Sequence, residues 1–104
     1  MRRPLRFSPA AQLVLGRFVA APSRWHHGYS LMTDLDLRSG TLYPVLMRLA
    51  EAGWLETRWE SPAREGRPPR HLYRLAGGAA PEARTLLEEW AIRELKYRVP
   101  KAAT

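Results

Sequence analysis

Apolar residues recur at helical spacing near the start of the chain. Ala11, Val14, Leu15, Phe18 and Val19 form one stripe. Ser8 as N-cap and Pro9 at the first helical position indicate where this helix begins, and Pro22 ends it. We therefore predict a helix over residues 9–21 and, from a second group of apolar residues (Leu31, Met32, Leu35), a short helix over about 27–35. The segment 23–28 between them is interpreted as a polar connection.

The next stretch, from about Ser39 to Ala52, has two different faces. Leu42, Leu46 and Leu49 lie at positions i, i+4 and i+7 and predict a buried stripe. The opposite side begins with small and polar residues and carries one arginine. A helix anchored by its leucines, with a low outer face, suits insertion into a DNA major groove; a surface helix of any small domain is the alternative.

Proline at position 44 affects where this third helix begins. Pro44 has no backbone N–H and is tolerated best in a first turn. It therefore favours a late start near Thr41 or a local bend, while Gly53 is suited to close the helix.

Two later stretches alternate with the period of a strand. Leu55, Thr57 and Trp59 alternate with charged residues, and His71, Tyr73 and Leu75 share a face. The loop over 61–69 between them is rich in proline and arginine, and it is too long for a tight turn. The pattern predicts a β-hairpin with a basic tip.

A last amphipathic helix is predicted from about Pro81 to Val99. Its apolar stripe consists of Ala83, Leu86, Leu87, Trp90, Ala91, Leu95 and Val99. This stripe needs a surface to cover it. The same helix of a second chain is the simplest partner; folding back onto the first helix, or a mixture of both, is the alternative.

The order of these elements is that of a winged helix-turn-helix. The fold class is mainly α with a small β-hairpin, followed by a C-terminal dimerisation helix. We divide the chain into residues 1–76, a DNA-binding domain, and 77–104, the dimerisation helix and tail.

Charge supports a polyanionic partner. The chain of 104 residues has a formal net charge of +7, and residues 1–75 hold 12 arginines against 6 acidic residues. Basic surface attracts DNA of any sequence, although a GC-rich genome also produces many arginines. There are no cysteines, no apolar run of membrane-spanning length and no signal-peptide core. We expect a soluble cytoplasmic protein of one modest core.

Three motifs resemble the PadR family of transcriptional regulators. Gly28-Tyr29-Ser-Leu is similar to the family's Gly-Tyr-x-Leu, and Tyr73-Arg74-Leu75 to the end of its wing. The most specific match is Gly40-Thr41-Leu42-Tyr43-Pro44-x-Leu46-x-x-Leu49, followed by Glu-x-Gly-x-Leu at 51–55. The resemblance covers roughly residues 10–100. It implies a winged helix-turn-helix dimer, held by C-terminal helices, that usually represses transcription and in some members responds to small phenolic or drug-like molecules.

The chain resembles the short branch of that family, with a single C-terminal helix, but departs from its pattern twice. Ala76 and Ala79 stand where the family often has Thr and Gly, which removes a cap and leaves the start of the last helix open. Pro68-Pro69 stand where many relatives have basic and glycine residues, which stiffens the wing loop.

The candidate DNA contacts lie on the third helix and the wing. Thr41, Tyr43, Pro44 and Arg48 would meet DNA from the helix, and Arg64, Arg67 and Arg70 would meet phosphates or the minor groove from the wing. The alternatives are packing of Tyr43 against the wing, an ion pair of Arg48 with Glu51 or Glu88, and a solvated wing tip. Arg2, Arg3 and Arg6 could form a basic arm, but we favour a disordered terminus.

The last helix offers a candidate ligand site. Leu86, Leu87, Trp90 and Tyr97 could line a dimer cleft that accepts a planar aromatic molecule, and some drug-responsive relatives place a pocket tryptophan where Trp90 stands. Ordinary dimer-core packing is the alternative.

Enzyme and metal chemistry are not expected. His26 and His27 have no third clustered ligand, and no nucleophile–base pair or phosphate loop is visible. We expect no cofactor. The main hypothesis is a homodimeric repressor that binds a pseudo-palindromic operator in double-stranded DNA and is released by a small aromatic ligand. The alternative is a winged-helix protein–protein interaction module without DNA binding.

Overall fold

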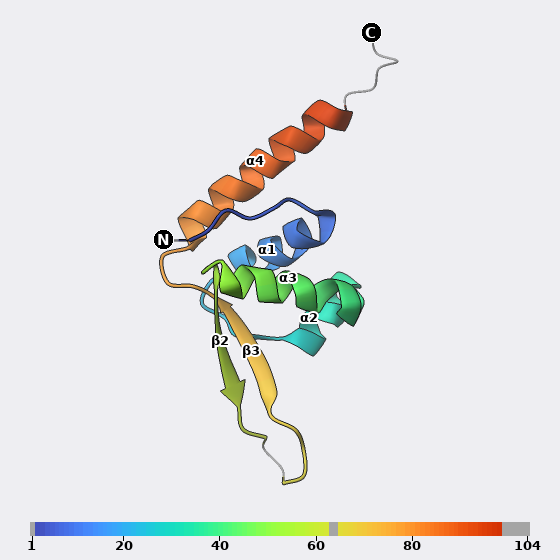
Figure 1. Cartoon of the computed structure of the whole chain (residues 1–104), viewed down its shortest axis with the longest axis vertical. Helices are drawn as coiled ribbons and strands as arrows, with labels where there is room; N and C mark the ends of the chain where they lie inside the picture. The colour runs from blue at the N-terminus through green and yellow to red at the C-terminus, as the bar shows by residue number, and fades with distance from the viewer. Residues whose placement is uncertain (1, 63–64, 99–104) are drawn as a thin grey trace.

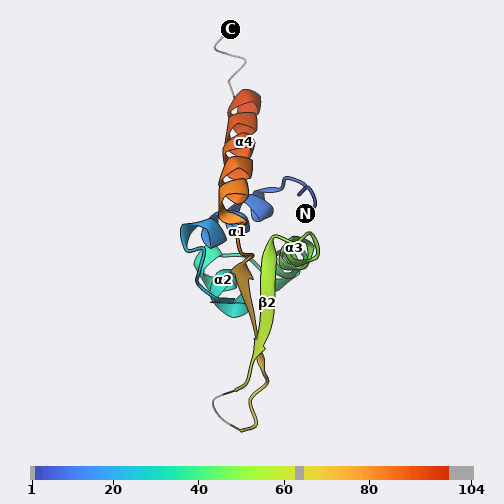
Figure 2. The same cartoon turned by 90° about the vertical axis from the view of Figure 1, so that its left-hand side faces the viewer.

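Three helices form the middle of the molecule, and a β-ribbon and a fourth helix project from it in opposite directions (Figures 1 and 2). The computed structural model describes residues 2–62 and 65–98, the last two by their backbone only. The elements in chain order are α1 (Pro9–Ala20), β1 (His26–His27), α2 (Gly28–Leu35), α3 (Ser39–Glu51), β2 (Leu55–Glu60), β3 (Arg70–Leu75) and α4 (Ala80–Arg98). This is the predicted winged-helix arrangement. No helix in these ranges is long and apolar enough to span a membrane.

Helix α1 begins as its sequence predicts. Ser8 is the N-cap, and its hydroxyl accepts a hydrogen bond of 3.0 Å from the backbone N–H of Ala11. Pro9 occupies the first turn, where its missing N–H costs nothing. The helix buries Val14, Leu15 and Phe18 completely.

The core confirms the leucine stripe of α3. Leu42, Leu46 and Leu49 are buried against α1 and Leu31 of α2, and Val45 widens the stripe. These side chains fix which side of α3 faces outward.

The start of α3 confirms the predicted range from about Ser39, and it differs from the late start near Thr41 that Pro44 favoured. The helix begins at Ser39, so Pro44 lies in its second turn. Its missing N–H leaves the carbonyl of Gly40 without an intrahelical donor. Gly40 is exposed, so water can pair with this carbonyl. Burial of the leucine stripe outweighs the local cost of the proline.

The ribbon is part of a three-stranded antiparallel sheet in the order β1-β3-β2, rather than a hairpin alone. The interpretation of residues 23–28 as a connection was wrong for β1, in which His26 pairs with Tyr73 and His27 with Leu72. A strand of two residues has no detectable periodicity. It forms because the ring of His26 is buried edge-to-face against Phe18, with centroids 5.0 Å apart.

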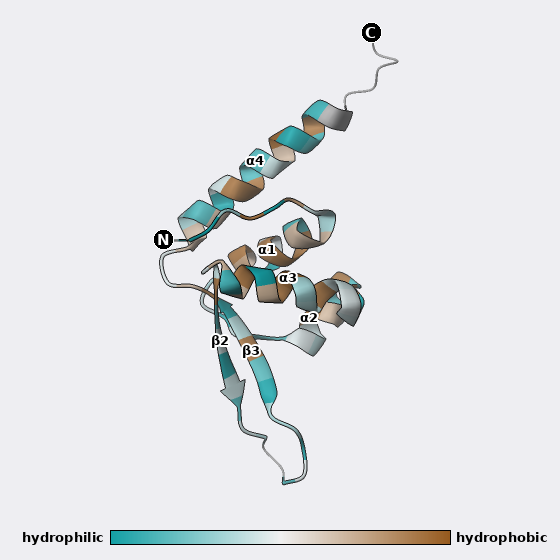
Figure 3. Cartoon of the chain, viewed as in Figure 1, coloured by the Kyte–Doolittle hydropathy of each residue, from teal (hydrophilic) through white to brown (hydrophobic). Residues whose placement is uncertain are grey.

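The half-buried face predicted for β2 is only partly correct. Leu55 is buried, but Thr57 is exposed and Trp59 is 67% exposed. The ribbon extends beyond the helices, and its far part is mostly hydrophilic (Figure 3). Within residues 2–62 and 65–98, no helix therefore covers this face of β2 near its end.

Helix α4 is covered by its own chain along one side only. Ala83 is buried, and Trp90, 3% exposed, packs edge-to-face on Phe7 with ring centroids 5.5 Å apart. Ile92 and Leu95 are 56% and 66% exposed. The helix thus folds back on the N-terminal segment and α1, and it also leaves apolar side chains unpaired in the single chain.

The N-terminal segment is ordered, contrary to the favoured disordered terminus. The Arg3 N–H donates to the carbonyl of Ala52 (2.8 Å), and the Trp54 indole N–H donates to the carbonyl of Arg3 (2.8 Å). Arg2 forms an ion pair of 2.6 Å with Glu82. Arg2 and Arg3 therefore tie the segment to the end of α3 and the start of α4.

Candidate nucleic-acid interface

The outer face of α3 is exposed to solvent in the part of the chain that the structure describes. Thr41, Tyr43, Pro44 and Arg48 are all exposed, as the sequence predicts, and Met47 is 59% exposed beside them. No hydrogen bond or ion pair is formed by the side chain of Arg48 within the described residues. The guanidinium is therefore available to an external partner.

Tyr43 is positioned by a close approach to Gly28. A Cβ atom added at Gly28 would lie 2.6 Å from the Tyr43 hydroxyl oxygen and 2.9 Å from its Cε1. The ring thus lies on bare backbone at the start of α2, and 37% of the residue stays exposed. The alternative named packing of Tyr43 against the wing, whereas the close contact of its ring is with α2.

Two of the three candidate arginines of the wing lie in the part of the chain that the structure describes. Arg67 and Arg70 are exposed, in the loop and at the start of β3. Arg64 lies outside the described residues. Arg70 also lines a cleft together with residues of α2 and α3.

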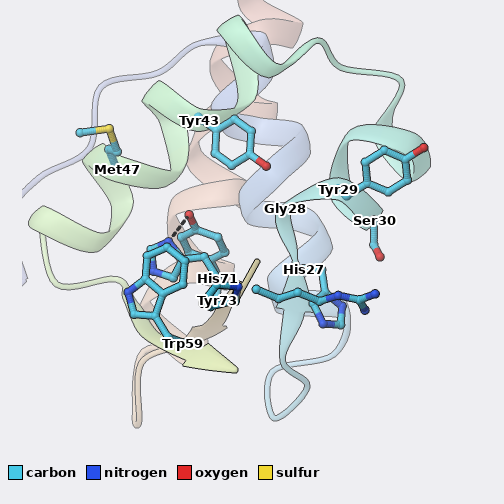
Figure 4. A pocket seen from close by; sticks show the side chains of 11 residues that line it. His27, Gly28, Tyr29, Ser30, Tyr43, Met47, Trp59, His71 and Tyr73 are labelled. Atoms are coloured by element: carbon cyan, nitrogen blue, oxygen red, sulfur yellow. Dashed lines mark hydrogen bonds between the residues drawn. The ribbon is translucent and has the colours of Figure 1, made fainter. Parts of the chain in front are cut away.

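A cleft of about 740 Å³ lies between the start of α2, the outer face of α3 and the sheet. Tyr43 and Met47 line it from α3, and Trp59, His71 and Tyr73 from the sheet (Figure 4). Of the candidate DNA contacts, Tyr43 of α3 and Arg70 of the wing line this concave surface.

Three aromatic rings form a ladder on the sheet side of this cleft. The Trp59 indole is stacked on His71, with centroids 4.4 Å apart and planes 12° from parallel. His71 in turn contacts Tyr73 at 4.4 Å, and the Tyr73 hydroxyl is hydrogen-bonded to His71 Nδ1 at 2.9 Å. Burial raises the pKa of Tyr73, and nearby Tyr43 raises it further. Both effects favour the protonated form of the Tyr73 hydroxyl.

Trp59 and His71 were missed as site residues in the sequence. The sequence signal was that both lie at alternating positions of the two strands. In the structure, Trp59 pairs with His71 across the hairpin. The sequence does not predict that they are paired, because the length of the loop over 61–69 does not define the register of the two strands.

The back of the sheet is clamped by cation–π contacts. The guanidinium groups of Arg58 and Arg74 lie over the Trp25 ring, 4.5 and 4.4 Å from its centroid. Glu56 accepts a hydrogen bond from Arg74 (2.7 Å), which together with the Gly77 N–H lowers the pKa of the Glu56 carboxyl. These contacts fix the ribbon relative to the helices.

Three of the residues predicted for a ligand pocket are covered, fully or in part, by other residues of the same chain. Trp90 is covered by Phe7, and Leu86 and Leu87 are half-buried against the core. The Tyr97 side chain lies outside the described residues. The structure thus brings Trp90 together with the N-terminal segment of its own chain.

His26 and His27 occupy separate environments. His26 is 6% exposed, and its Nε2 has no hydrogen-bond partner among the residues that the structure describes. Burial lowers the pKa of His26, and the charges of Arg24 and Arg17 lower it further. His27 lies 3.5 Å from Glu60. Within the described ranges, no three side chains of metal-binding type are grouped.

Comparisons with known proteins agree with this geometry. A PadR family transcription regulator from Clostridium difficile R20291 has a TM-score of 0.67 at 15% identity, covering 89% of this chain and all 100% of the other. A possible transcriptional regulator from Methanosarcina mazei Go1 has a TM-score of 0.65 at 21% identity, covering 90% and 81%. A PadR-like transcription factor from Bacteroides fragilis has 0.62 at 22% identity, covering 86% and 88%. These likenesses show a shared winged-helix fold.

The sequence comparison identifies the family. No curated protein matches the chain significantly. Residues 22–80, which span β1 to the start of α4 and include the outer face of α3 and the wing, match the model of the transcriptional regulator PadR-like family. Because this match covers more than half of the chain, the chain belongs to the PadR-like family of transcriptional regulators.

Proposed function

We propose that this regulator is a cytoplasmic homodimeric repressor that binds a pseudo-palindromic operator. The observation that carries the proposal is the free outer face of α3, which stands beside a wing with exposed arginines. Residues 1–76 would bind DNA, and residues 77–104 would pair the protomers. Occupation of the operator would exclude polymerase from the promoter.

The residues of α3 have distinct roles in this proposal. Thr41, in the first turn of α3, donates to a phosphate or a base edge where the helix dipole favours anions. Tyr43 donates its hydroxyl to a phosphate, and Pro44 packs on the groove wall. Arg48 reads a guanine edge.

The wing supplies contacts that do not depend on sequence. Arg67 and Arg70, together with Arg64, would neutralise phosphates flanking the groove that α3 enters. Pro68 and Pro69 restrict the backbone beside them, so these charges are presented at a low entropy cost.

The second half of α4 supports pairing of two chains. Ile92 and Leu95 are one helical turn apart and exposed. Burial of two such side chains from each protomer adds apolar area that a single chain leaves in water. The paired helices would set the distance between the two copies of α3.

Release by a small aromatic ligand is the last part of the proposal. Trp90 is packed on Phe7 in the single chain, so a flat ligand would replace Phe7 at the indole. The test is tryptophan fluorescence titrated with planar aromatics in wild type and in Trp90→Phe. A response of equal size in both proteins would contradict a site at Trp90.

DNA binding is tested directly by a mobility-shift assay with the region upstream of the gene and with random duplex. We expect tighter, salt-dependent binding to the upstream region by a dimer. A monomer that ignores both duplexes but captures a protein partner would overturn the proposal in favour of an interaction module.

A further inference from the structure

Trp59 combines high exposure with a fixed orientation. Two thirds of the residue is exposed to solvent, yet its ring is stacked on His71 and held at 12° to it. Large aromatic side chains that are rigid before binding provide contact area at little entropic cost, and they are enriched where partners meet. Trp59 lies on the side of the sheet that faces the cleft (Figure 4). The chain thus presents a preformed contact surface there.

The cleft has the chemistry of an anion site with a flat wall. Its described lining includes Arg70, His27 and His71 and no carboxylate, although the Glu60 carboxylate lies 3.5 Å from His27. The Tyr73 hydroxyl is bonded to His71 Nδ1, and the Trp59 indole N–H can only donate. A partner with acceptor oxygens and an apolar part between them fits this wall. The sugar–phosphate strand of DNA alternates anionic phosphates with apolar sugar faces.

The position of the cleft favours the same partner. It lies between α3 and the ribbon. In winged-helix binding, the helix enters the major groove and the wing lies at the adjacent minor groove. The strand that separates these two grooves must then pass between the helix and the wing.

We propose that this cleft holds one sugar–phosphate strand of the operator and that the indole of Trp59 packs against a deoxyribose in it. The inference rests on the proposed function. The contact made by Trp59 is neutral and adds to those of the arginines. Neither the motif of α3 nor the charge of the wing identifies this residue. His71 is the positioning residue that holds the indole in place.

The first test compares Trp59→Ala with Trp59→Phe and with Thr57→Ala, which changes the same face of the same strand outside the cleft. Binding of an end-labelled mixed-sequence duplex of about three helical turns is followed by fluorescence anisotropy. For Trp59→Ala we expect an affinity about tenfold lower, as for loss of an interface tryptophan, with an unchanged dependence on salt because no charge is lost. Trp59→Phe should lie between, and Thr57→Ala should match wild type.

The second test measures the indole itself. Acrylamide quenches the exposed Trp59 in wild type, and duplex should protect it; the protected component should be missing in Trp59→Phe. This readout remains decisive if Trp59→Ala fails to fold in thermal denaturation.

Three outcomes would overturn the inference. If Trp59→Ala binds duplex like wild type while Arg48→Ala binds more weakly, the cleft is not a strand site but the proposed function stands. If benzoate protects Trp59 and duplex does not, the cleft takes a small aromatic acid instead. If wild type binds neither this duplex nor the region upstream of the gene, the proposed function fails together with the inference.

Discussion

At Gly28, one missing methyl group decides where Tyr43 lies. The Tyr43 hydroxyl oxygen is 2.6 Å from the position that a Cβ would take. Gly28→Ala must therefore push the tyrosine ring toward solvent, out of the place from which it would reach a phosphate. Because the displaced atoms are the far end of a partly exposed side chain, we expect the loss of stability to stay below about 1 kcal/mol, with a clear loss of DNA affinity in anisotropy titrations.

Gly16→Ala is the matched control for this change. An added Cβ at Gly16 meets nothing within 4 Å, and the residue lies inside α1. The variant should be more stable by about 0.5–1 kcal/mol and should bind DNA like wild type. Equal DNA affinities for Gly28→Ala and wild type would show that the position of Tyr43 does not matter for binding.

His26 makes stability depend on pH. Burial, followed by the charges of Arg24 and Arg17, lowers the pKa of His26 in the folded chain below its ordinary value of 6.5. As pH falls through 6.5, the unfolded chain binds a proton at this residue before the folded chain does. Stability is thus fully present above that pH and is lost as pH falls toward the folded pKa.

The measurement is the unfolding temperature of wild type and His26→Phe at about pH 7.5 and about pH 5.5. Phenylalanine keeps the edge-to-face contact with Phe18 and removes the titrating group. We expect wild type to lose more stability on acidification than the variant, since His27 and His71 remain in both. An equal loss in the two proteins would assign the acid sensitivity to other groups.

At the scale of the element, α3 and the wing should make different kinds of DNA contact: α3 reads bases, and the wing neutralises phosphates. Arg48 is an exposed residue on the helix. Arg48→Ala should therefore weaken the free energy of DNA binding by about 1–3 kcal/mol and relax specificity at one base position. Competition among duplexes mutated at single positions measures this. A loss that is equal for every duplex would make Arg48 a backbone contact.

Arg67, in the wing loop, should act differently. Arg67→Ala removes one charge that would neutralise a phosphate, so it should weaken binding to all sequences alike and reduce the slope of log affinity against log salt by about 0.9. Anisotropy titrations over a series of salt concentrations give the slope. An unchanged slope with an altered sequence preference would reverse the roles of Arg67 and Arg48.

The elements that sequence analysis predicted are those with local signals. The cap at Ser8 and the leucines at 42, 46 and 49 define their helices within a few residues, and the structure confirms both. Strand β1 and the docking of Arg2 and Arg3 depend on contacts across the chain, so no local pattern revealed them. The same holds for the cleft, because its walls come from elements separated by a long loop.

At the scale of the whole molecule, α4 leaves apolar side chains exposed on the side of the helices that lies away from the wing (Figure 1). The side of α4 that bears Trp90 is buried on its own chain, whereas Ile92 and Leu95 are exposed farther along. Two half-sites are read together only when both copies of α3 are held at a fixed distance. In the proposed dimer, pairing through α4 would therefore link the stability of the dimer to its affinity for the operator.

The double variant Ile92→Glu with Leu95→Glu tests this link. Charges at two exposed apolar positions should leave the fold of one chain intact and prevent pairing, because buried carboxylates without partners are costly. Sedimentation should show a monomer, and affinity should fall far more for a duplex with two half-sites than for one with a single half-site. Thr85→Glu, which adds charge to α4 without removing an apolar side chain, is the control and should remain a dimer. A double variant that still sediments as a dimer would place the interface elsewhere, and equal losses on both duplexes would separate pairing from operator recognition.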